Sequence, residues 1–160
     1  MIESARWWAP STRWRTAVSA ADNKKLMESL FARVAAGDRK PFLDHIAADV
    51  VMRVTGHYSW SQTIRGKEAL FRDFYGYLAS VLADGNRRTV AHRFIADGDH
   101  VVVESVGDMR TKAGVPYNNE YCLIYRLREG KIVEMTEYCD SALCERVLGP
   151  FPAKRKQQAG

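Results

Sequence analysis

The chain has 160 residues, of which 46% are hydrophobic and 27% are charged, and its formal net charge is +5. This length and composition are typical of one soluble globular domain, and no apolar run reaches the ~18–20 residues that a membrane-spanning helix needs. The surplus charge belongs to the two ends: residues 1–21 carry +2, residues 150–160 carry +3, and residues 22–149 are neutral. Because a nucleic-acid-binding domain carries its basic surplus on a folded face, we expect neither a nucleic-acid partner nor a membrane partner.

Cysteine and histidine usage bears on compartment and cofactors. The three cysteines, Cys122, Cys139 and Cys144, are odd in number and form no CxxC motif, and the four histidines show no metal-ligand spacing such as HExxH. Free thiols are typical of a reducing compartment, so we expect a cytoplasmic protein. The sequence predicts neither a bound metal nor another cofactor.

The N-terminal third is predicted to be helical after an irregular start. Residues 1–21 combine three tryptophans with scattered arginines and lack periodicity, so we expect a flexible basic and aromatic extension. Asp22 has the chemistry of a helix N-cap, and apolar residues then recur at helical spacing as far as Gly37, which ends the first helix. Pro41 suits the first turn of a short second helix.

The rest of the chain alternates helical and strand patterns. Residues 49–55 alternate as a strand, residues 57–66 form a polar loop containing Trp60, and a third helix is predicted from about 67 to 82. Short turns then separate four further strands, which favours an antiparallel meander. These strands are predicted over residues 88–96, 100–111, 115–128 and 131–138.

A last helix, over about 140–148, completes one domain at residues 22–149, and residues 150–160 are predicted to be a basic disordered tail. Helices first and strands later are typical of the α+β class. We expect a curved, mainly antiparallel sheet wrapped around the N-terminal helices, cone-shaped with an inner pocket.

Period-two alternation assigns one face of each strand to the interior. The assigned inner face is mostly apolar and the outer face is charged, so the register of the sheet is well specified. The inner set contains Met52, Val54, Val90, His92, Phe94, Val101, Val103, Ser105, Gly107, Met109, Tyr117, Asn119, Tyr121, Leu123, Val133, Met135 and Glu137.

Glu137 is the candidate catalytic residue. It ends an apolar row on the final strand, where a carboxylate is costly unless it has a partner or a chemical role. Its alternative is a salt bridge with an arginine from a helix or loop. A carboxyl held in an apolar pocket binds its proton more tightly than in water, which suits a general base or acid near neutral pH.

The other inner polar residues are candidates for binding a ligand. His92, Ser105, Asn119 and Tyr121 each have a structural alternative: a hydrogen-bonded core histidine, a small packing residue, a core amide, or a core ring with its hydroxyl at the rim. An apolar cavity with a few convergent polar groups is typical of a small-molecule site. The predicted substrate-binding set for a small hydrophobic ligand is Asn119, Tyr121, His92, Ser105, Met52, Val54 and Met135.

Two segments resemble a known superfamily: HRFIADGDHVVVES at 92–105 and EYCLIYRLREGKIVEMTEYCD at 120–140. They are similar to nuclear transport factor 2-like proteins, which include ketosteroid isomerase, limonene epoxide hydrolase and the polyketide cyclases called SnoaL-like. The resemblance covers about residues 22–149 and implies the fold described above. It also implies a homodimer.

The resemblance transfers few catalytic residues. The general-base aspartate of the isomerase falls at Val54, and its oxyanion-hole aspartate falls at or near Leu123. The arginine and one aspartate of the epoxide hydrolase fall on the strand that carries Ser105 and Gly107, and its other aspartate matches Glu137. One carboxylate of these known sets is therefore retained.

Two functions remain open at this point. In the first, the protein is an enzyme that isomerises, cyclises or hydrolyses a compact hydrophobic molecule with Glu137 as base or acid. In the second, it is a non-catalytic module that binds a small molecule or forms dimers. The outer sheet face favours a two-fold interface, because it mixes charges with Cys122, Ile124, Ile132 and Tyr138.

Overall fold

The computed structural model describes residues 18–85 and 87–153. Most of the predicted N-terminal extension and the last seven residues of the predicted tail lie outside this part of the chain. No helix among the described residues is long and apolar enough to cross a membrane. The elements in chain order are α1 (Ala20–Ala35), α2 (Lys40–His45), β1 (Ile46–Val54), β2 (Gln62–Arg65), α3 (Lys67–Ala69), η1 (Leu70–Tyr75), α4 (Gly76–Val81), β3 (Arg88–Asp97), β4 (His100–Asp108), β5 (Glu120–Arg128), β6 (Lys131–Cys139) and α5 (Ser141–Leu148).

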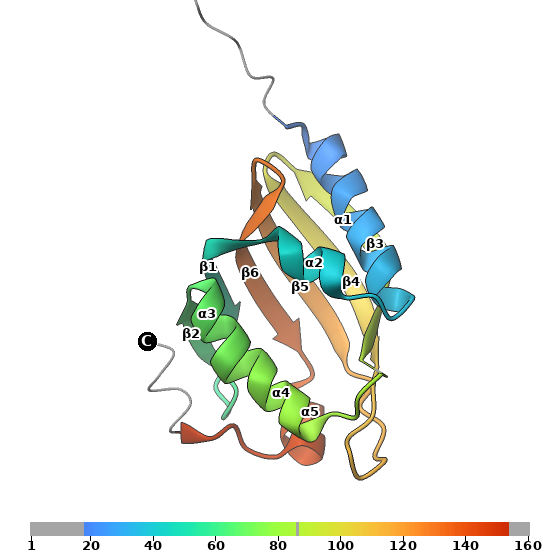
Figure 1. The fold of residues 1–160 in the computed structure, drawn as a ribbon, viewed down its shortest axis with the longest axis vertical. Helices are drawn as coiled ribbons and strands as arrows, with labels where there is room; N and C mark the ends of the chain where they lie inside the picture. Colours follow the sequence, from blue (N-terminus) through green and yellow to red (C-terminus); the bar gives the residue numbers. More distant parts are fainter. Residues whose placement is uncertain (1–17, 86, 154–160) are drawn as a thin grey trace, which may run out of the picture.

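The six strands form one sheet in the order β2-β1-β6-β5-β4-β3. Strand β1 runs parallel to β6, and every other neighbouring pair is antiparallel. Figure 1 shows α1 and α2 crossing one face of the curved sheet and α3, η1 and α4 forming one rod beside them. The predicted α+β fold, with helices packed on one side of a mainly antiparallel sheet, is confirmed.

The first helix starts three residues earlier than the sequence suggested. Ser19, not Asp22, is the N-cap: its hydroxyl accepts from the backbone N–H of Asp22 at 3.1 Å, while the Asp22 carboxylate accepts from the backbone N–H of Ser19 at 3.3 Å. This reciprocal pair is a capping box, in which the acidic residue belongs to the first turn. Helix α1 then buries Met27 and Leu30 against the sheet.

The predicted third helix is continuous but widens in its middle. The turn η1 is a π-helix, in which the N–H of Gly76 bonds to the carbonyl of Phe71, five residues earlier. A π turn lets more residues share one side of the helix than an α turn does. The neighbouring aromatic residues Phe74 and Tyr75 both face the space between this helix and the sheet, where they line the cavity described below.

A bulge in β3 overturns the predicted inner position of two residues. Ala91 pairs with Ser105 while Arg93 pairs with Glu104, so His92 is the extra residue and the alternation reverses there. His92 is therefore exposed, and Val90, which precedes the bulge, is 48% exposed. Strict period-two counting placed both inside because a bulge leaves no mark in the hydrophobic pattern.

A second irregularity moves Ile132 from the outer to the inner face. The pairing of β5 with β6 shifts between Arg126 and Leu127, so Leu127 lies opposite Ile132. Ile132 is fully buried in the core. Period-two alternation had instead placed it on the outer face. Beyond the shift, Met135 and Glu137 keep their predicted inner positions and line the cavity.

The stretch predicted to be a polar loop contributes to both sheet and core. It contains β2 and the indole of Trp60, which is 2% exposed and donates from Nε1 to the carbonyl of Gly149 at 2.9 Å. The ring of Phe151 lies 4.9 Å from the Trp60 ring and is 5% exposed. Packing therefore continues past residue 150, the predicted start of the tail.

Candidate functional site

A cavity of about 150 Å³, partly open to solvent, lies between the helices and the inner face of the sheet. Its walls come from both layers: Phe31 and Phe42 from α1 and α2, Phe74 from η1, and Leu123 and Met135 from β5 and β6. Such a volume accommodates a ligand about the size of one benzene ring. Aromatic and aliphatic walls around a few polar groups fit a compact, largely apolar molecule.

The structure brings five of the eight predicted site residues to this cavity. Met52 and Val54 reach it from β1, Tyr121 from β5, and Met135 and Glu137 from β6. Their convergence follows from the register, since β1 and β6 pair Met52 with Met135 and Val54 with Glu137. Two parallel neighbouring strands thus present apolar side chains and one carboxyl to the same space.

The other three predicted residues lie away from the cavity. His92 is on the outer face, where its Nε2 lies 3.7 Å from a carboxylate oxygen of Glu104. Ser105 is 1% exposed on the inner face, and its Oγ has no hydrogen-bond partner among the described residues. Neither residue lines the cavity.

Asn119 is fully buried, and its amide joins two segments of backbone. Its Nδ2 donates to the carbonyl of Asp140 and to the hydroxyl of Tyr117, each at 3.0 Å, and its Oδ1 accepts from the backbone N–H of Asp140 at 2.9 Å. With these bonds the side chain ties the start of β5 to the start of α5, which supports the structural alternative for this residue.

Glu137 is the one carboxylate among the described residues that line the cavity. It lies opposite Val54 on β1 and Leu123 on β5, so apolar side chains flank it on both neighbouring strands. Burial raises the pKa of this carboxyl to about 7. At neutral pH the side chain is therefore divided between a form that accepts a proton and a form that donates one.

Tyrosine hydroxyls supply most of the other polar atoms. Burial raises the pKa values of Tyr58, Tyr117 and Tyr121 well above the usual value, so these phenols stay protonated and can donate hydrogen bonds. The Tyr58 hydroxyl lies 3.3 Å from the sulfur of Cys139. Burial also raises the pKa of the Cys139 thiol to about 11, so this sulfur stays protonated at neutral pH.

Sequence reasoning missed several cavity residues that strands do not carry. Tyr58 and Trp60 lie in the segment predicted to be a polar loop, and Tyr75 belongs to the widened turn of the third helix. Arg39 lies between α1 and α2. Two large aromatic residues inside a polar loop are a signal that the loop packs on a core, whereas nothing in the sequence marks Arg39.

The arrangement suits proton transfer to or from a bound molecule. A carboxyl with a pKa near 7 can take a proton from carbon or oxygen, and phenolic hydroxyls can stabilise negative charge that develops on an oxygen atom. The aromatic walls lower the polarity around the site, which strengthens both interactions.

Comparisons with known proteins identify the fold. A family described as "SnoaL-like domain" matches residues 27–135. A nuclear transport factor 2-like protein of unknown function from Burkholderia pseudomallei has 19% identity and a TM-score of 0.66 over 79% of this chain and 96% of that one. A protein of unknown function with a cystatin-like fold from Xanthomonas campestris has 20% identity and a TM-score of 0.62 over 80% and 98%.

A third similar structure is that of TerC, co-crystallised with polyporic acid, with 23% identity and a TM-score of 0.63 over 79% of this chain and 97% of that one. At these identities the similarities show a shared fold alone. Among curated proteins, no sequence matches the chain significantly.

Proposed function

We propose that this chain, which belongs to the SnoaL-like domain family, binds a small, largely apolar molecule in its cavity and moves a proton on it with Glu137. The observation that carries the proposal is the carboxyl of Glu137, which faces an aromatic cavity and has a pKa raised to about 7 by burial. Strongly perturbed carboxyls in clefts are typical of general acids and bases.

The proposed step begins with a carbonyl compound in the cavity. The Glu137 carboxylate takes a proton from the carbon next to the carbonyl. The electron pair of the broken C–H bond forms a C=C bond, and the π pair of the C=O bond moves onto the carbonyl oxygen. The hydroxyls of Tyr58 and Tyr121 would donate hydrogen bonds to that oxygen, since both residues line the cavity. Return of the proton from Glu137 to another atom gives an isomer. Attack of the enolate carbon on a second carbonyl of the same molecule forms a C–C bond and closes a ring, the π pair of that carbonyl moves onto its oxygen, and the protonated Glu137 returns the proton to this alkoxide.

Isomerisation or cyclisation is favoured over hydrolysis for this site. Hydrolysis of the kind that the resemblance implied needs additional charged groups beside the one carboxyl, and their matching positions hold Ser105 and Gly107. Neither of these residues lines the cavity. One base with several neutral donors is sufficient for proton transfer at carbon.

The alternative is a binding protein without catalysis. It is favoured by the apolar residues Val54 and Leu123, which line the cavity at the positions where the isomerase of the resemblance has acidic groups. Such a protein would hold its ligand through the aromatic walls, and Glu137 would then serve to select a ligand that donates a hydrogen bond.

Hydrogen–deuterium exchange separates the two functions without knowledge of the natural substrate. Compact cyclic ketones are incubated with the protein in D2O, and loss of the α-proton signals is followed by NMR. Wild-type protein is expected to accelerate exchange, with a rate that rises through pH about 7 as Glu137 ionises. Glu137→Gln is expected to slow exchange ~10²–10⁴-fold.

The matched control is Glu120→Gln, which makes the same change at an exposed position on β5 and should leave the exchange rate unchanged. Saturable binding of the ketones without accelerated exchange would support the binding protein instead. Exchange that persists in Glu137→Gln would contradict the assignment of Glu137 as the base.

A further inference from the structure

Arg39 is a charged residue of the cavity that the proton-transfer scheme does not use. It lines the main cavity and also an adjoining hollow of about 60 Å³, to which Arg87 contributes as well. The guanidinium carbon of Arg39 lies 5.8 Å from the centre of the Tyr75 ring. Burial lowers the pKa of Arg39, and the charge of Arg87 lowers it further, yet a guanidinium remains charged at neutral pH.

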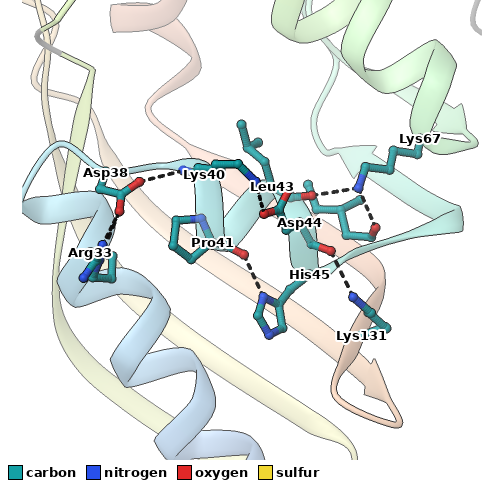
Figure 2. Close-up of polar contacts among 10 residues, drawn as sticks. Arg33, Asp38, Lys40, Pro41, Leu43, Asp44, His45, Lys67 and Lys131 are labelled. Carbon is teal, nitrogen blue, oxygen red and sulfur yellow. Dashed lines mark hydrogen bonds and ion pairs between the residues drawn. The ribbon is translucent and has the colours of Figure 1, made fainter.

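The carboxylates near Arg39 in the sequence are engaged elsewhere, as Figure 2 shows. Asp38 accepts from Nε of Arg33 at 3.1 Å and from the backbone N–H of Lys40 at 3.1 Å, and Asp44 pairs with the Lys40 ammonium. Among the described residues, no carboxylate forms an ion pair with Arg39. A partly buried cation without a counter-ion is costly, so a ligand anion would relieve this cost.

The short helix α2, which follows Arg39, is held at its C-terminal end by two lysines. Lys67 at the start of α3 donates to the carbonyls of Leu43 at 2.9 Å and Ile46 at 3.0 Å, and Lys131 donates to the carbonyl of Asp44 at 3.0 Å (Figure 2). These bonds fix α2 against the third helix and the end of the β5–β6 hairpin. The carbonyl of Arg39 accepts from the backbone N–H of Leu43 at 3.1 Å, so Arg39 is joined to this fixed helix, which favours the recognition of a ligand of fixed geometry.

Arg39 and Glu137 line the same cavity without pairing with each other. Burial raises the pKa of Tyr75 to about 12, and of the two charges that act on this phenol, Arg39 lowers its pKa and Glu137 raises it. No ion pair joins Arg39 to Glu137 in the described part of the chain. The cavity thus offers a cation and a carboxyl at different positions, with aromatic walls around them.

We propose that Arg39 binds the carboxylate of a small cyclic or aromatic organic acid whose ring occupies the cavity beside Glu137. A planar guanidinium matches a carboxylate through two parallel hydrogen bonds. The ring is held by apolar walls such as Phe31, Phe42 and Leu78. Arg87, whose side chain pairs with the exposed Asp84 at 3.3 Å, is a second cationic residue that lines the adjoining hollow.

The reaction of such an acid at Glu137 rests on the proposed function. Its binding to Arg39 does not, because a ligand can bind without being turned over. Isothermal titration calorimetry with benzoate and with the neutral analogue benzamide tests the binding directly. The titrations are done at about pH 6, below the pKa of about 7 at which Glu137 becomes an anion that would repel benzoate.

Benzoate is expected to bind at least ~10-fold more tightly than benzamide, and Arg39→Gln should abolish this difference by weakening benzoate at least ~10-fold. Arg39→Lys, which keeps the charge without the planar fork, should lose part of the affinity. The control is Arg65→Gln, an exposed position on β2 outside the cavity. Equal melting temperatures for Arg39→Gln and Arg65→Gln would show that the first variant is folded.

Three results would overturn the inference: equal affinity for benzoate and benzamide, equal loss of both in Arg39→Gln, or binding of inorganic phosphate as tight as that of benzoate.

Glu137→Gln separates this inference from the proposed function. If that variant loses deuterium exchange and keeps benzoate, both proposals stand. If benzoate binds through Arg39 and ketone exchange is absent even in wild type, the anion site stands and the catalytic proposal fails. If neither benzoate binding nor ketone exchange is detected, both proposals fail.

Discussion

At the scale of single residues, the environment of Glu137 links function to stability. The unfolded chain exposes this carboxyl to water, whereas the folded protein holds it in the cavity with its pKa raised from 4.5 to about 7. The folded state therefore binds the proton more tightly than the unfolded state. Its stabilising contribution is complete below pH 4.5 and is lost as pH rises through about 7.

Glu137→Gln is accordingly expected to change stability in a pH-dependent way. The variant should match wild type near pH 4 and become more stable by about 1–3 kcal/mol at pH 8, because glutamine carries no charge to desolvate. Urea denaturation at a series of pH values measures the difference, with Glu120→Gln as the exposed control. A constant difference across the series would mean that burial does not perturb this carboxyl.

Asn119 provides the contrasting case of a buried polar residue with a structural role. Asn119→Ala removes two donated bonds and one accepted bond and leaves the backbone N–H of Asp140 without its partner, while the Asp140 carbonyl keeps the bond from the N–H of Cys144. We expect a loss of about 2–4 kcal/mol in unfolding free energy and little change in benzoate affinity per folded molecule. The neighbouring Asn118→Ala, at an exposed position, should cost much less, as denaturant titration will show. A loss of affinity without a loss of stability would restore Asn119 to the binding site.

At the scale of elements, the segment after α5 closes an aromatic cluster around Trp60. Phe151 lies 4.9 Å from the Trp60 ring, 5.1 Å from Tyr77 and 6.1 Å from Phe74. Its backbone N–H donates to the Ser59 hydroxyl at 2.8 Å. The cluster supports the turn that carries Tyr58 into the cavity, so the C-terminal segment contributes to the site without touching it.

Phe151→Ala is expected to destabilise the domain by about 3–5 kcal/mol, since it leaves a hole among large rings. Thermal or urea unfolding measures this, and Val115→Ala, at a position that is 47% exposed, serves as control. A cost within ~0.5 kcal/mol would indicate that this segment does not pack in solution, as the predicted tail at 150–160 requires.

At the scale of the whole molecule, the outer sheet face carries an apolar row across the strands β3, β4 and β5. Ile95 pairs with Val102, Val102 with Ile124, and Ile124 with Thr136, and residues that pair share one face. Ile95 is 55% exposed. Ile132, which was predicted to belong to the dimer interface, lies in the core. The row of Ile95, Val102 and Ile124 takes its place as a continuous apolar strip on the outer face.

We propose that two copies of the chain associate through this outer sheet face. Ile124→Lys should convert a dimer into a monomer, because it places a charge at the centre of an apolar interface. Analytical ultracentrifugation at tens of micromolar measures the mass, and Thr63→Lys on the edge strand β2 is the control. A wild-type monomer at that concentration would refute the proposal.

Local patterning was sufficient for much of this molecule. Helical spacing, turn residues and period-two alternation predicted the main helices, the meander of β3 to β6 and the inner position of Glu137, because each depends on neighbours within a few residues. The strand β2 and the parallel pairing of β1 with β6 were not predicted. The same patterning predicted an apolar inner face with few polar groups. These features follow from the requirement to bury one side of each element.

Tertiary structure decided the rest of the site. The bulge at His92 reversed a strand face, and the shift near Leu127 moved Ile132 inward, since bulges depend on how two strands fit together and leave the hydrophobic pattern unchanged. Asn119 became a structural residue because Asp140 lies beside it in space. Arg39 joined Glu137 in one cavity only because α2 packs across the sheet, and no local pattern records which distant residues will share an enclosed volume.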